Sequence, residues 1–430
     1  MKISRNQSLL KIAGKMVLLS LVMFVSTTAR CQVDQADRIN GWNADIDTLL
    51  YIMKTQHYVY RNKPLPSALI NAAAKLKTEI AEYSDERMLT ELERLAYYMH
   101  DGHSYILPVS RKITAYYLPV QFYLFNDGVY IINADKPYKN LIGARMSRIN
   151  GVEVKTLVGD MNSFIHQDNL YTVKWFAPSI LRFRALYECY GLPAGSATVK
   201  VEITDPQNKS SEADVAFIPA IDFHGIPKLF PSALTQNVAP LYLKDVSNNF
   251  WFTWLNNRKT LYFQFNQVED KQDETLDAFG KRFGDTLSAS KPLLLIIDVR
   301  NNNGGNLALL TTLMDGITGF EKKNPEAKIV IITGRNTFSA AQVFISCMNK
   351  NTHALFAGEP SSSSPNFVGE GNYIVLPYSG AMGSISNKYH ESIPGDTRKW
   401  IAPDIPVSLS STAYFNNEDP VMVAIEKKFE

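Results

Sequence analysis

The chain has 430 residues, of which 45% are apolar and 20% are charged. This is the composition of a globular protein, and it excludes a disordered chain, a collagen-like chain and a coiled coil. The 44 Lys and Arg residues nearly balance the 42 Asp and Glu residues, which leaves a net charge of +2. A nucleic-acid-binding protein usually has a much larger basic excess, so we expect no nucleic-acid partner. At roughly 100–200 residues per domain, the length predicts two or three domains.

Residues 1–31 are typical of a secretory signal peptide. They contain five basic residues and no acidic residue, and an apolar run from Met16 to Val25 follows the basic start. The run is shorter than the roughly 20 apolar residues of a membrane-spanning helix, and we expect cleavage before Gln32. Loss of the five positive charges changes the net charge from +2 to −3. The mature protein is therefore expected to be exported, to the periplasm, the medium or the cell surface, without a stable membrane anchor. A retained amphipathic start is the alternative.

Cysteine usage argues against a disulfide framework and against a metal site. Three cysteines are present, and cleavage of the leader leaves Cys189 and Cys347. Two cysteines make neither a disulfide framework nor a metal cluster, and the chain has no HExxH motif. We expect no metal and no cofactor, and we expect both cysteines to be small buried apolar residues.

Residues 32–105 are predicted to form a helical module. Ser84 is a good N-cap for the last of three helices, and Asp101-Gly102 ends that helix. Apolar residues recur at helical spacing in three stretches: Ile46, Leu49, Leu50 and Met53; Leu69, Ala73, Leu76 and Ile80; Met88, Leu92, Leu95 and Met99.

Residues 106–225 change to short strand-like runs that turn residues separate. Asn150-Gly151, between two apolar runs, is a strong signal for a tight turn. This region is therefore predicted to be rich in β-structure.

Residues 226–430 alternate strands and helices. Pro292–Val299 and Lys328–Thr333 are largely apolar runs, as expected of strands buried on both faces. Helices are predicted over Leu307–Phe320 and Ala340–Met348. The order β-α-β-α predicts a largely parallel sheet covered by helices, so the fold class is a multi-domain α/β protein.

The ends of these two strands carry the clearest chemistry, because sites in α/β sheets gather at the carboxyl ends of strands. Gly304-Gly305 follows the first strand, and Ser339 follows the second at the start of a helix. The Ser339 hydroxyl is a candidate nucleophile. The amides of Ala340 and of Gly304 or Gly305 are candidates for an oxyanion hole. The alternative is that Ser339 only satisfies backbone donors at the beginning of its helix.

A nucleophilic serine needs a base. Among seven histidines, His103 stands out because it follows Asp101-Gly102 at a helix-to-strand junction. The glycine before it lets the imidazole face a cleft. An ordinary surface or core histidine is the alternative interpretation.

These segments together resemble the tail-specific or C-terminal processing protease family, and more closely its tricorn-like serine peptidase branch. The resemblance covers nearly the whole mature chain in order. Its motifs are DGHS, DVRNNNGGN, ITGRNTFSAAQVF, GEPSSSSPNFVGE and IAPDI, with a PDZ-like GARMSRINGVEV between the first two. It implies a PDZ-like region over 106–225 and an α/β serine peptidase domain over 226–430, of the ClpP/crotonase-like type.

The resemblance also implies how the serine is activated. One branch uses a lysine roughly two dozen residues after the nucleophile, and this place falls in residues 360–365, which contain none. The other branch uses the histidine of the DGH segment, which is His103 here. A carboxylate before Pro403-Asp404 should orient the histidine. Asp396 is nearest to the expected place and Glu391 is the alternative, although each is equally interpreted as a loop acid.

The sequence therefore predicts an exported serine peptidase that acts on peptide or protein substrates by Ser/His acyl-enzyme catalysis, in one version at peptide carboxyl ends. The alternative is a peptidase-like protein that binds peptides or other ligands without cleaving them. Relatives often carry an acidic residue three positions after the serine, where this chain has Gln342. An esterase is disfavoured, because the chain has no G-x-S-x-G motif.

Overall fold

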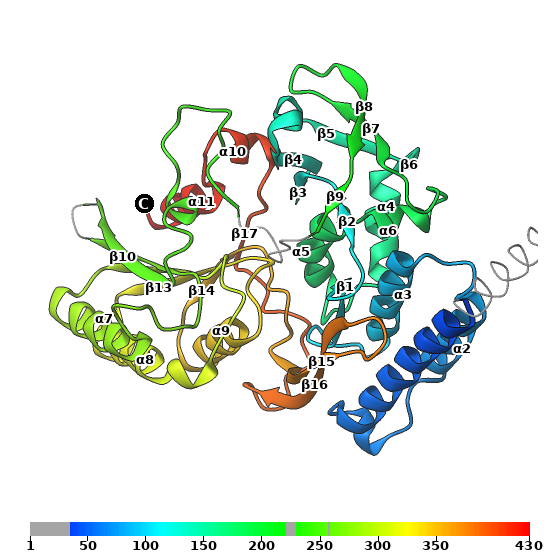
Figure 1. Ribbon diagram of the computed structural model, residues 1–430. Coiled ribbons are helices and arrows are strands. Elements are labelled where there is room, and N and C mark those ends of the chain that lie inside the picture. The colour runs from blue at the N-terminus through cyan, green and yellow to red at the C-terminus, as the bar shows by residue number, and fades with distance from the viewer. Residues whose placement is uncertain (1–34, 221–228, 257–258) are drawn as a thin grey trace, which may run out of the picture.

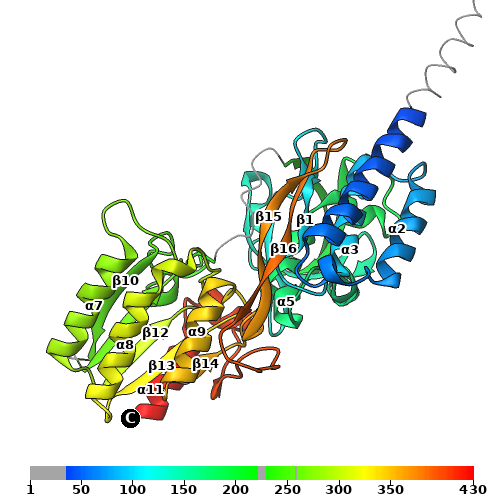
Figure 2. The same ribbon diagram turned by 90° about the horizontal axis from the view of Figure 1, so that it is seen from below.

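The computed structural model describes residues 35–220, 229–256 and 259–430 (Figure 1). The predicted signal peptide lies outside the described residues. Figure 2 shows two bodies, one built on a helix-covered sheet and the other on smaller sheets and the first helices. In the part of the chain that the structure describes, no helix is both long and apolar enough to cross a membrane. Cys189 and Cys347 are free thiols, and both are half-buried rather than fully buried as predicted.

The three predicted N-terminal helices are present. Residues 35–56 are helical, and α2 (Ser67–Glu79) and α3 (Asp85–Tyr97) follow. Ser84 caps α3 as predicted, because its side-chain oxygen accepts a hydrogen bond of 3.0 Å from the Arg87 N–H. The buried faces of the helices carry the apolar residues whose spacing predicted them.

The β-rich region is an antiparallel sheet in the order β3-β4-β5-β7-β8, with β6 beside β5. Asn150 (φ 52°) and Gly151 (φ 75°) form the predicted turn, since both have the positive φ that a tight hairpin turn requires. The strands are β3 (Val120–Phe125), β4 (Gly128–Ala134), β5 (Arg145–Ile149), β6 (Val152–Glu153), β7 (Thr198–Thr204) and β8 (Ser210–Ala216). The helices are α4 (Val154–Asp160), α5 (Leu170–Ile180) and α6 (Arg184–Glu188). A short pair, β2 (Tyr116–Tyr117) and β9 (Ile218–Pro219), joins the region's two ends.

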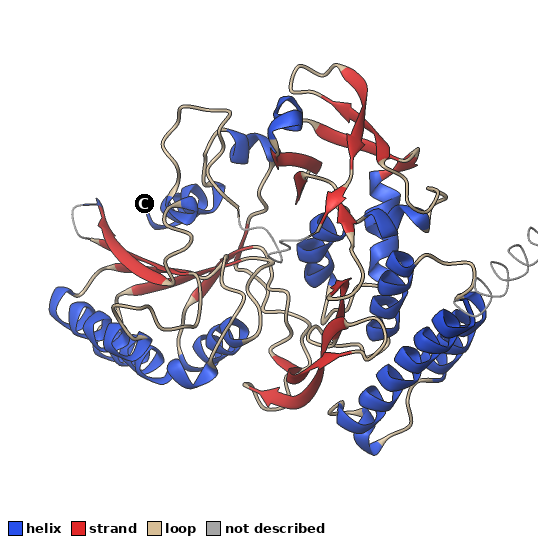
Figure 3. Ribbon diagram, viewed as in Figure 1, coloured by secondary structure: helices blue, strands red, loops and turns tan. Residues whose placement is uncertain are grey.

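The C-terminal body is the predicted α/β unit, with strand order β10-β11-β12-β13-β14-β17. All neighbours are parallel except β10, which is antiparallel to β11. The strands are β10 (Phe250–Leu255), β11 (Thr260–Phe265), β12 (Leu294–Asp298), β13 (Lys328–Thr333), β14 (Leu355–Gly358) and β17 (Ile405–Pro406). Helices α7 (Leu276–Ser290), α8 (Thr311–Lys323) and α9 (Ala340–Asn351) lie on one face, as Figure 3 shows. On the other face lies α11 (Pro420–Phe429), while α10 (Ser411–Phe415) packs nearer β3 and β4.

Alternate side chains of the central strand confirm that the sheet is buried on both faces. Leu295 and Ile297 pack with α7 to α9, whereas Ile296 packs with α11. A strand covered on both sides must be apolar at every position, which is why the sequence there shows no alternation.

A hairpin from the C-terminal part of the chain returns to the N-terminal helices. Strands β15 (Asn366–Val375) and β16 (Ala381–Glu391) form a three-stranded sheet with β1 (Tyr105–Ser110). Ile374, Leu376 and Ile385 of this hairpin share one core with the first helices. Asp45, which is fully buried, accepts hydrogen bonds of 2.8 Å from the amides of Tyr378 and Ser379 at the hairpin turn.

We predict that Asp45→Ala lowers the free energy of unfolding by about 3 kcal/mol, because it leaves two buried amides without their charged acceptor. The measurement is urea denaturation followed by circular dichroism. Asp47→Ala is the control, since Asp47 lies on the same helix but is exposed and pairs with Lys77 at the surface. It should cost less than about 1 kcal/mol. Equal losses in the two variants would contradict this account of the hairpin contact.

Candidate active site

Ser339 occupies a strained turn between β13 and α9. Its φ of 56° and ψ of −121° are unfavourable for a residue with a side chain, and such a conformation costs about 1–3 kcal/mol. The Ser339 side chain makes no capping hydrogen bond to α9. The alternative interpretation of Ser339 as a residue that satisfies the helix's donors is therefore wrong, and its hydroxyl is available for another role.

The Gly304-Gly305 loop lies directly against this turn. A methyl group added at Gly304 would be 2.7 Å from Ser339 Cβ and 2.9 Å from Ala340 N, so only glycine fits there. The Gly304 N–H is already used, since it donates to Asn302 Oδ1 at 2.9 Å. Of the three predicted oxyanion donors, the amides of Gly305 and Ala340 are then the better candidates. Ala340 is the first residue of α9, where an N–H has no partner within the helix.

A buried tract of three serines is hydrogen-bonded to the Ser339 turn. Ser361, Ser362 and Ser363 are fully buried. The Ser362 N–H donates to Thr337 O at 3.1 Å, and Ser363 Oγ accepts from the Ser339 N–H at 3.5 Å. These bonds fix the strained conformation from outside the turn itself.

The loop that carries His103 is organised by one carboxylate. Asp101 Oδ1 accepts hydrogen bonds from the amides of His103 (2.8 Å) and Ser104 (2.6 Å) and from Ser386 Oγ (2.7 Å). Asp101 Oδ2 lies 2.9 Å from His57 Nε2. Burial alone would raise the pKa of Asp101, but the hydrogen bonds and the charge of His57 lower it to about 2. Asp101 therefore remains ionised and holds the loop in place.

The imidazole of His103 is one ring of an aromatic stack. It lies between Phe338 (4.2 Å between ring centroids) and Phe367 (5.1 Å), and His390 stacks on the far side of Phe367 (5.1 Å). Phe338 immediately precedes Ser339, so the stack places His103 next to the nucleophile turn. Burial lowers the pKa of His103 to about 4, with Asp101 opposing this shift and His166 and His390 adding to it. The resting ring is therefore neutral at pH 7.

No hydrogen bond joins His103 to Ser339. Both ring nitrogens of His103 are buried and have no hydrogen-bond partner among the described residues. The structure thus brings the predicted base beside the predicted nucleophile, but it leaves the bond between them unformed.

The two predicted orienting carboxylates have other partners. Asp396 accepts hydrogen bonds from the Arg398 guanidinium (2.6 and 2.9 Å), and these bonds lower the pKa of Asp396. Glu391 is exposed, and its Oε1 accepts from the Gly395 N–H at 3.2 Å. Neither residue is hydrogen-bonded to His103, and an orienting role for either one stays a prediction.

Sequence reasoning missed Asp168. Its Oδ1 accepts a hydrogen bond of 2.8 Å from the Gly102 N–H, while its Oδ2 is buried and has no hydrogen bond of good geometry with any described residue, although the Ser363 hydroxyl is close enough to lower the pKa of the carboxyl. Burial, and after it the negative charge of Asp101, raise the pKa of Asp168 to about 7, against the lowering effects of hydrogen bonds from the Gly102 amide and the Ser363 hydroxyl and of the charge of Lys399. No sequence signal marks this residue, because the contact joins positions 66 apart.

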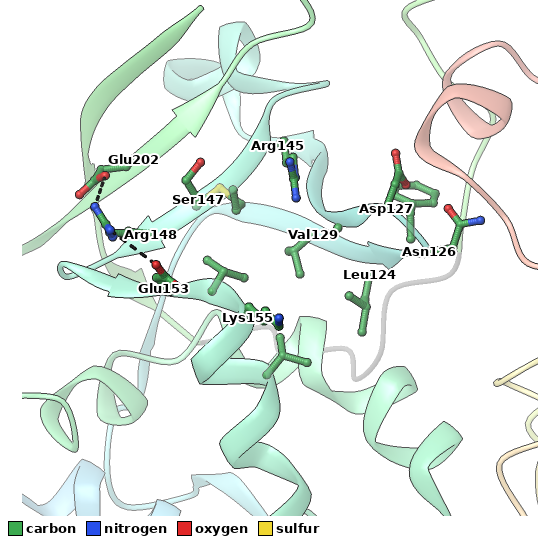
Figure 4. Close-up of a pocket in the computed structure, with 15 residues that line it drawn as sticks. Leu124, Asn126, Asp127, Val129, Arg145, Ser147, Arg148, Glu153, Lys155 and Glu202 are labelled. Carbon is green, nitrogen blue, oxygen red and sulfur yellow. Dashed lines mark hydrogen bonds and ion pairs between the residues drawn. The ribbon is translucent and has the colours of Figure 1, made fainter. Parts of the chain in front are cut away.

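A cavity of about 650 Å³ lies away from Ser339, between the β3–β4 turn, β5 and α4 (Figure 4). Arg148, on its wall, pairs with Glu153 (3.6 Å) and Glu202 (3.5 Å). Arg145 and Lys155 also line it, and neither has an ion pair with any residue that the structure describes. The third acid of the lining, Asp127, is hydrogen-bonded to Ser411, so the lining has three cations and three acids, and Arg145 and Lys155 are its cations without an ion-pair partner among the described residues.

This cavity is connected to the nucleophile turn through one arginine. Arg335, four residues before Ser339, donates to Leu124 O at 2.6 Å, and Leu124 lines the cavity. The same guanidinium forms a two-bond pair with Glu359 (2.7 and 2.9 Å).

Among the described residues, no group of three His, Cys, Asp or Glu side chains could hold a metal ion.

No protein-family model and no curated protein matches the chain. Solved structures do match it. Mature CPAF complexed with lactacystin has a TM-score of 0.62 at 12% identity, over 91% of this chain and 97% of that one. The photosystem II D1 C-terminal processing protease has a TM-score of 0.38 at 15% identity, over 85% and 92%. A putative S41 protease from Bacteroides fragilis has 0.39 at 14%, over 89% and 97%.

The chain has the fold of mature CPAF. The similarity to CPAF extends over nearly the whole of both chains, so it includes the helices, the β-rich region and the parallel sheet together. The resemblance drawn from the ordered motifs is confirmed at the level of the fold.

We predict that Gly304→Ala slows covalent labelling of Ser339 by a fluorophosphonate by about 10²-fold or more. The new methyl group would push the Ser339 side chain and the Ala340 amide away from the glycine loop. Time-resolved mass spectrometry of the labelled peptide gives the rate.

Gly319→Ala on α8 is the control, since nothing lies within 4 Å of a methyl group there. Equal labelling rates in wild type and Gly304→Ala would show that this loop takes no part in the site.

Proposed function

We propose that this protein is a serine peptidase that hydrolyses peptide bonds through an acyl-enzyme on Ser339. The observation that carries the proposal is the strained Ser339 turn. A serine hydroxyl that caps nothing sits at a strand-to-helix junction, against a glycine loop and beside a neutral imidazole. Strained backbone of this kind is maintained at sites where the side chain must point in one direction.

The chemistry follows from these groups. Neutral His103 takes the proton of Ser339 Oγ as the oxygen attacks the substrate carbonyl, and the amides of Ala340 and Gly305 stabilise the oxyanion. The resulting imidazolium gives its proton to the leaving amine, and water then releases the acyl group. Because neither ring nitrogen of His103 is hydrogen-bonded to Ser339 Oγ, the proposed reaction requires a movement of the His103 side chain that forms this bond.

The proposal includes export of the mature protein, supported by the leader-like composition of residues 1–31. It also includes a preference for peptide carboxyl ends. The β-rich, PDZ-like region supports this preference, since its cavity carries the unpaired cations Arg145 and Lys155 beside apolar side chains such as Val129 and Val158. A carboxylate with an apolar side chain next to it complements such a lining.

We predict that a fluorophosphonate labels the mature protein at Ser339 and that Ser339→Ala abolishes the labelling. His103→Gln should reduce both the labelling rate and the hydrolysis of a peptide library by a factor on the order of 10³ or more, as removal of the base usually does. His353→Gln is the matched control, because the side chain of His353 is 99% exposed. Mass spectrometry and peptide release provide the two readouts. Tight peptide binding without labelling would support the non-catalytic alternative.

We predict that Arg145→Gln combined with Lys155→Gln weakens binding of peptides that have a free carboxyl terminus by about tenfold or more. Binding of the same peptides with an amidated terminus should change little, because they lack the charge that these cations attract. Fluorescence anisotropy with the Ser339→Ala protein measures both affinities without turnover. Equal effects of the double substitution on both peptide forms would exclude a carboxylate site in this cavity.

A further inference from the structure

Two buried groups at the site lack well-formed hydrogen bonds to any residue that the structure describes, and both lie beside Gly102. The first is the imidazole of His103, of which neither nitrogen is hydrogen-bonded, and the second is Asp168 Oδ2. Buried polar atoms are nearly always paired in folded proteins, so two orphans at one place require an explanation. One of them is a base that needs a negative partner during proton transfer, and the other is a carboxyl oxygen.

The surroundings of Gly102 show how close these groups are. A methyl group at Gly102 would lie 3.2 Å from Asp168 Oδ2 and 3.0 Å from the Phe338 ring, which stacks on His103. The Gly102 N–H holds Asp168 through its other oxygen, Oδ1. The free oxygen of Asp168 therefore lies at the base of the loop that presents His103.

The backbone next to Asp168 is tied to the nucleophile side of the site. Asn169, the N-cap of α5, donates through Nδ2 to Ser361 O (3.2 Å) and to Lys399 O (2.8 Å). The neighbouring Thr172 hydroxyl donates to Ser362 O at 2.7 Å. Because the serine tract also supports the Ser339 turn, Asp168 is held in a fixed position relative to both Ser339 and His103.

The other candidate carboxylates are committed elsewhere. Asp101 already accepts bonds from two amides, from Ser386 and from His57. Asp396 is paired with Arg398, and Glu391 faces solvent. Among these four carboxyl groups, only Asp168 has a buried oxygen without a well-formed hydrogen bond in the part of the chain that the structure describes, and the Ser363 hydroxyl nearby is its one side-chain donor in reach.

We propose that Asp168 is the positioning carboxylate of His103, and that Asp168 Oδ2 accepts a hydrogen bond from the imidazole when the ring turns toward Ser339. This inference rests on the proposed peptidase function. In the reaction, the proton of Ser339 Oγ moves to the free ring nitrogen, the imidazolium is held by the Asp168 carboxylate, and the proton leaves with the amine. No further reactant is needed.

The protonation states explain why the pair matters. Burial raises the pKa of Asp168 to about 7 and lowers that of His103 to about 4. A neutral imidazole with so low a pKa is a weak base on its own. Once the two groups share a hydrogen bond, they bind their first proton as a pair near neutral pH, and the second only near pH 4. The charged neighbours are Asp101 and Lys399 around Asp168, and Asp101, His166 and His390 around His103.

The test follows the His103 ring by NMR from pH 3 to 9 in protein with labelled histidine, with the signal assigned by its loss in His103→Gln. In wild type the ring signals should move in two steps, near pH 7 and near pH 4. In Asp168→Asn the upper step should disappear, because the first proton no longer has a carboxylate partner. Asp160→Asn is the control, since Asp160 lies in the same region and bonds to Tyr190, and it should keep both steps.

Kinetics provide the second readout. The rise of kcat/KM with pH should shift to lower pH in Asp168→Asn, and the plateau should fall by about 10²–10⁴-fold, as it does when an orienting carboxylate is neutralised. The substitution should not unfold the protein. Asn retains the Oδ1 acceptor for the Gly102 N–H, and it removes a carboxyl whose raised pKa means that stability is lost as pH rises through about 7. Asp168→Asn should therefore unfold at a higher temperature than wild type at pH 8.

Two results would overturn the proposal. One is a His103 signal that moves in a single step near pH 4 in wild type and identically in Asp168→Asn. The other is loss of the upper step in Asp396→Asn with Asp168→Asn unchanged, which would assign the role to Asp396. Failure of the peptidase proposal is distinguishable, because it would leave Ser339 unlabelled whatever the NMR titration shows.

Discussion

The site depends on the hydrogen bonds that the Asp101 carboxylate accepts. They join three segments that are far apart in the chain: the end of the first helix through His57, the loop of His103, and β16 through Ser386. A buried carboxylate is costly unless its oxygens are saturated, and here they are. The low pKa of Asp101 means that this arrangement persists at any ordinary pH. Together with the bond from the Gly102 N–H to Asp168, these bonds fix the backbone of residues 101–104 and hold His103 beside Phe338.

The β15–β16 hairpin explains how an N-terminal histidine reaches a C-terminal serine. The hairpin leaves the α/β body just after the serine tract and packs against the N-terminal helices, where Asp45 binds its turn. On its way it contributes Phe367 to the stack around His103. The helical module and the hairpin thus share one core, which residues 374–385 of the hairpin complete.

Sequence reasoning succeeded where the signal was local. A few neighbouring residues were enough to predict three features: the buried strands β12 and β13, the Ser84 cap and the Asn150-Gly151 turn. The proximity of Ser339 to the glycine loop could also be predicted from the sequence, because consecutive βα units place their loops at the same edge of a parallel sheet.

The rest of the site depends on contacts between distant positions, which periodicity does not reveal. The stack of Phe338, His103 and Phe367 joins three separate segments, and Asp168 meets Gly102 from 66 residues away. The Gly304 amide was a reasonable oxyanion donor from its spacing, and only the structure shows that Asn302 occupies it. For the same reason, a carboxylate chosen by its distance along the chain, such as Asp396, was found bonded to a neighbouring arginine.

Burial makes His103 a weak base on its own, and in the proposed mechanism the same burial favours its pairing with Asp168. Stacking between aromatic rings keeps the His103 imidazole neutral, which is the form that accepts a proton, but the same dry surroundings disfavour the imidazolium that must follow. The buried surroundings likewise disfavour the charged form of Asp168, which is its carboxylate. Each group lowers the cost of charging the other when they meet. In the proposed reaction the active form is therefore a strained serine, a neutral histidine and an ionised carboxyl, and the imidazolium–carboxylate pair forms only while the proton of Ser339 is in transit.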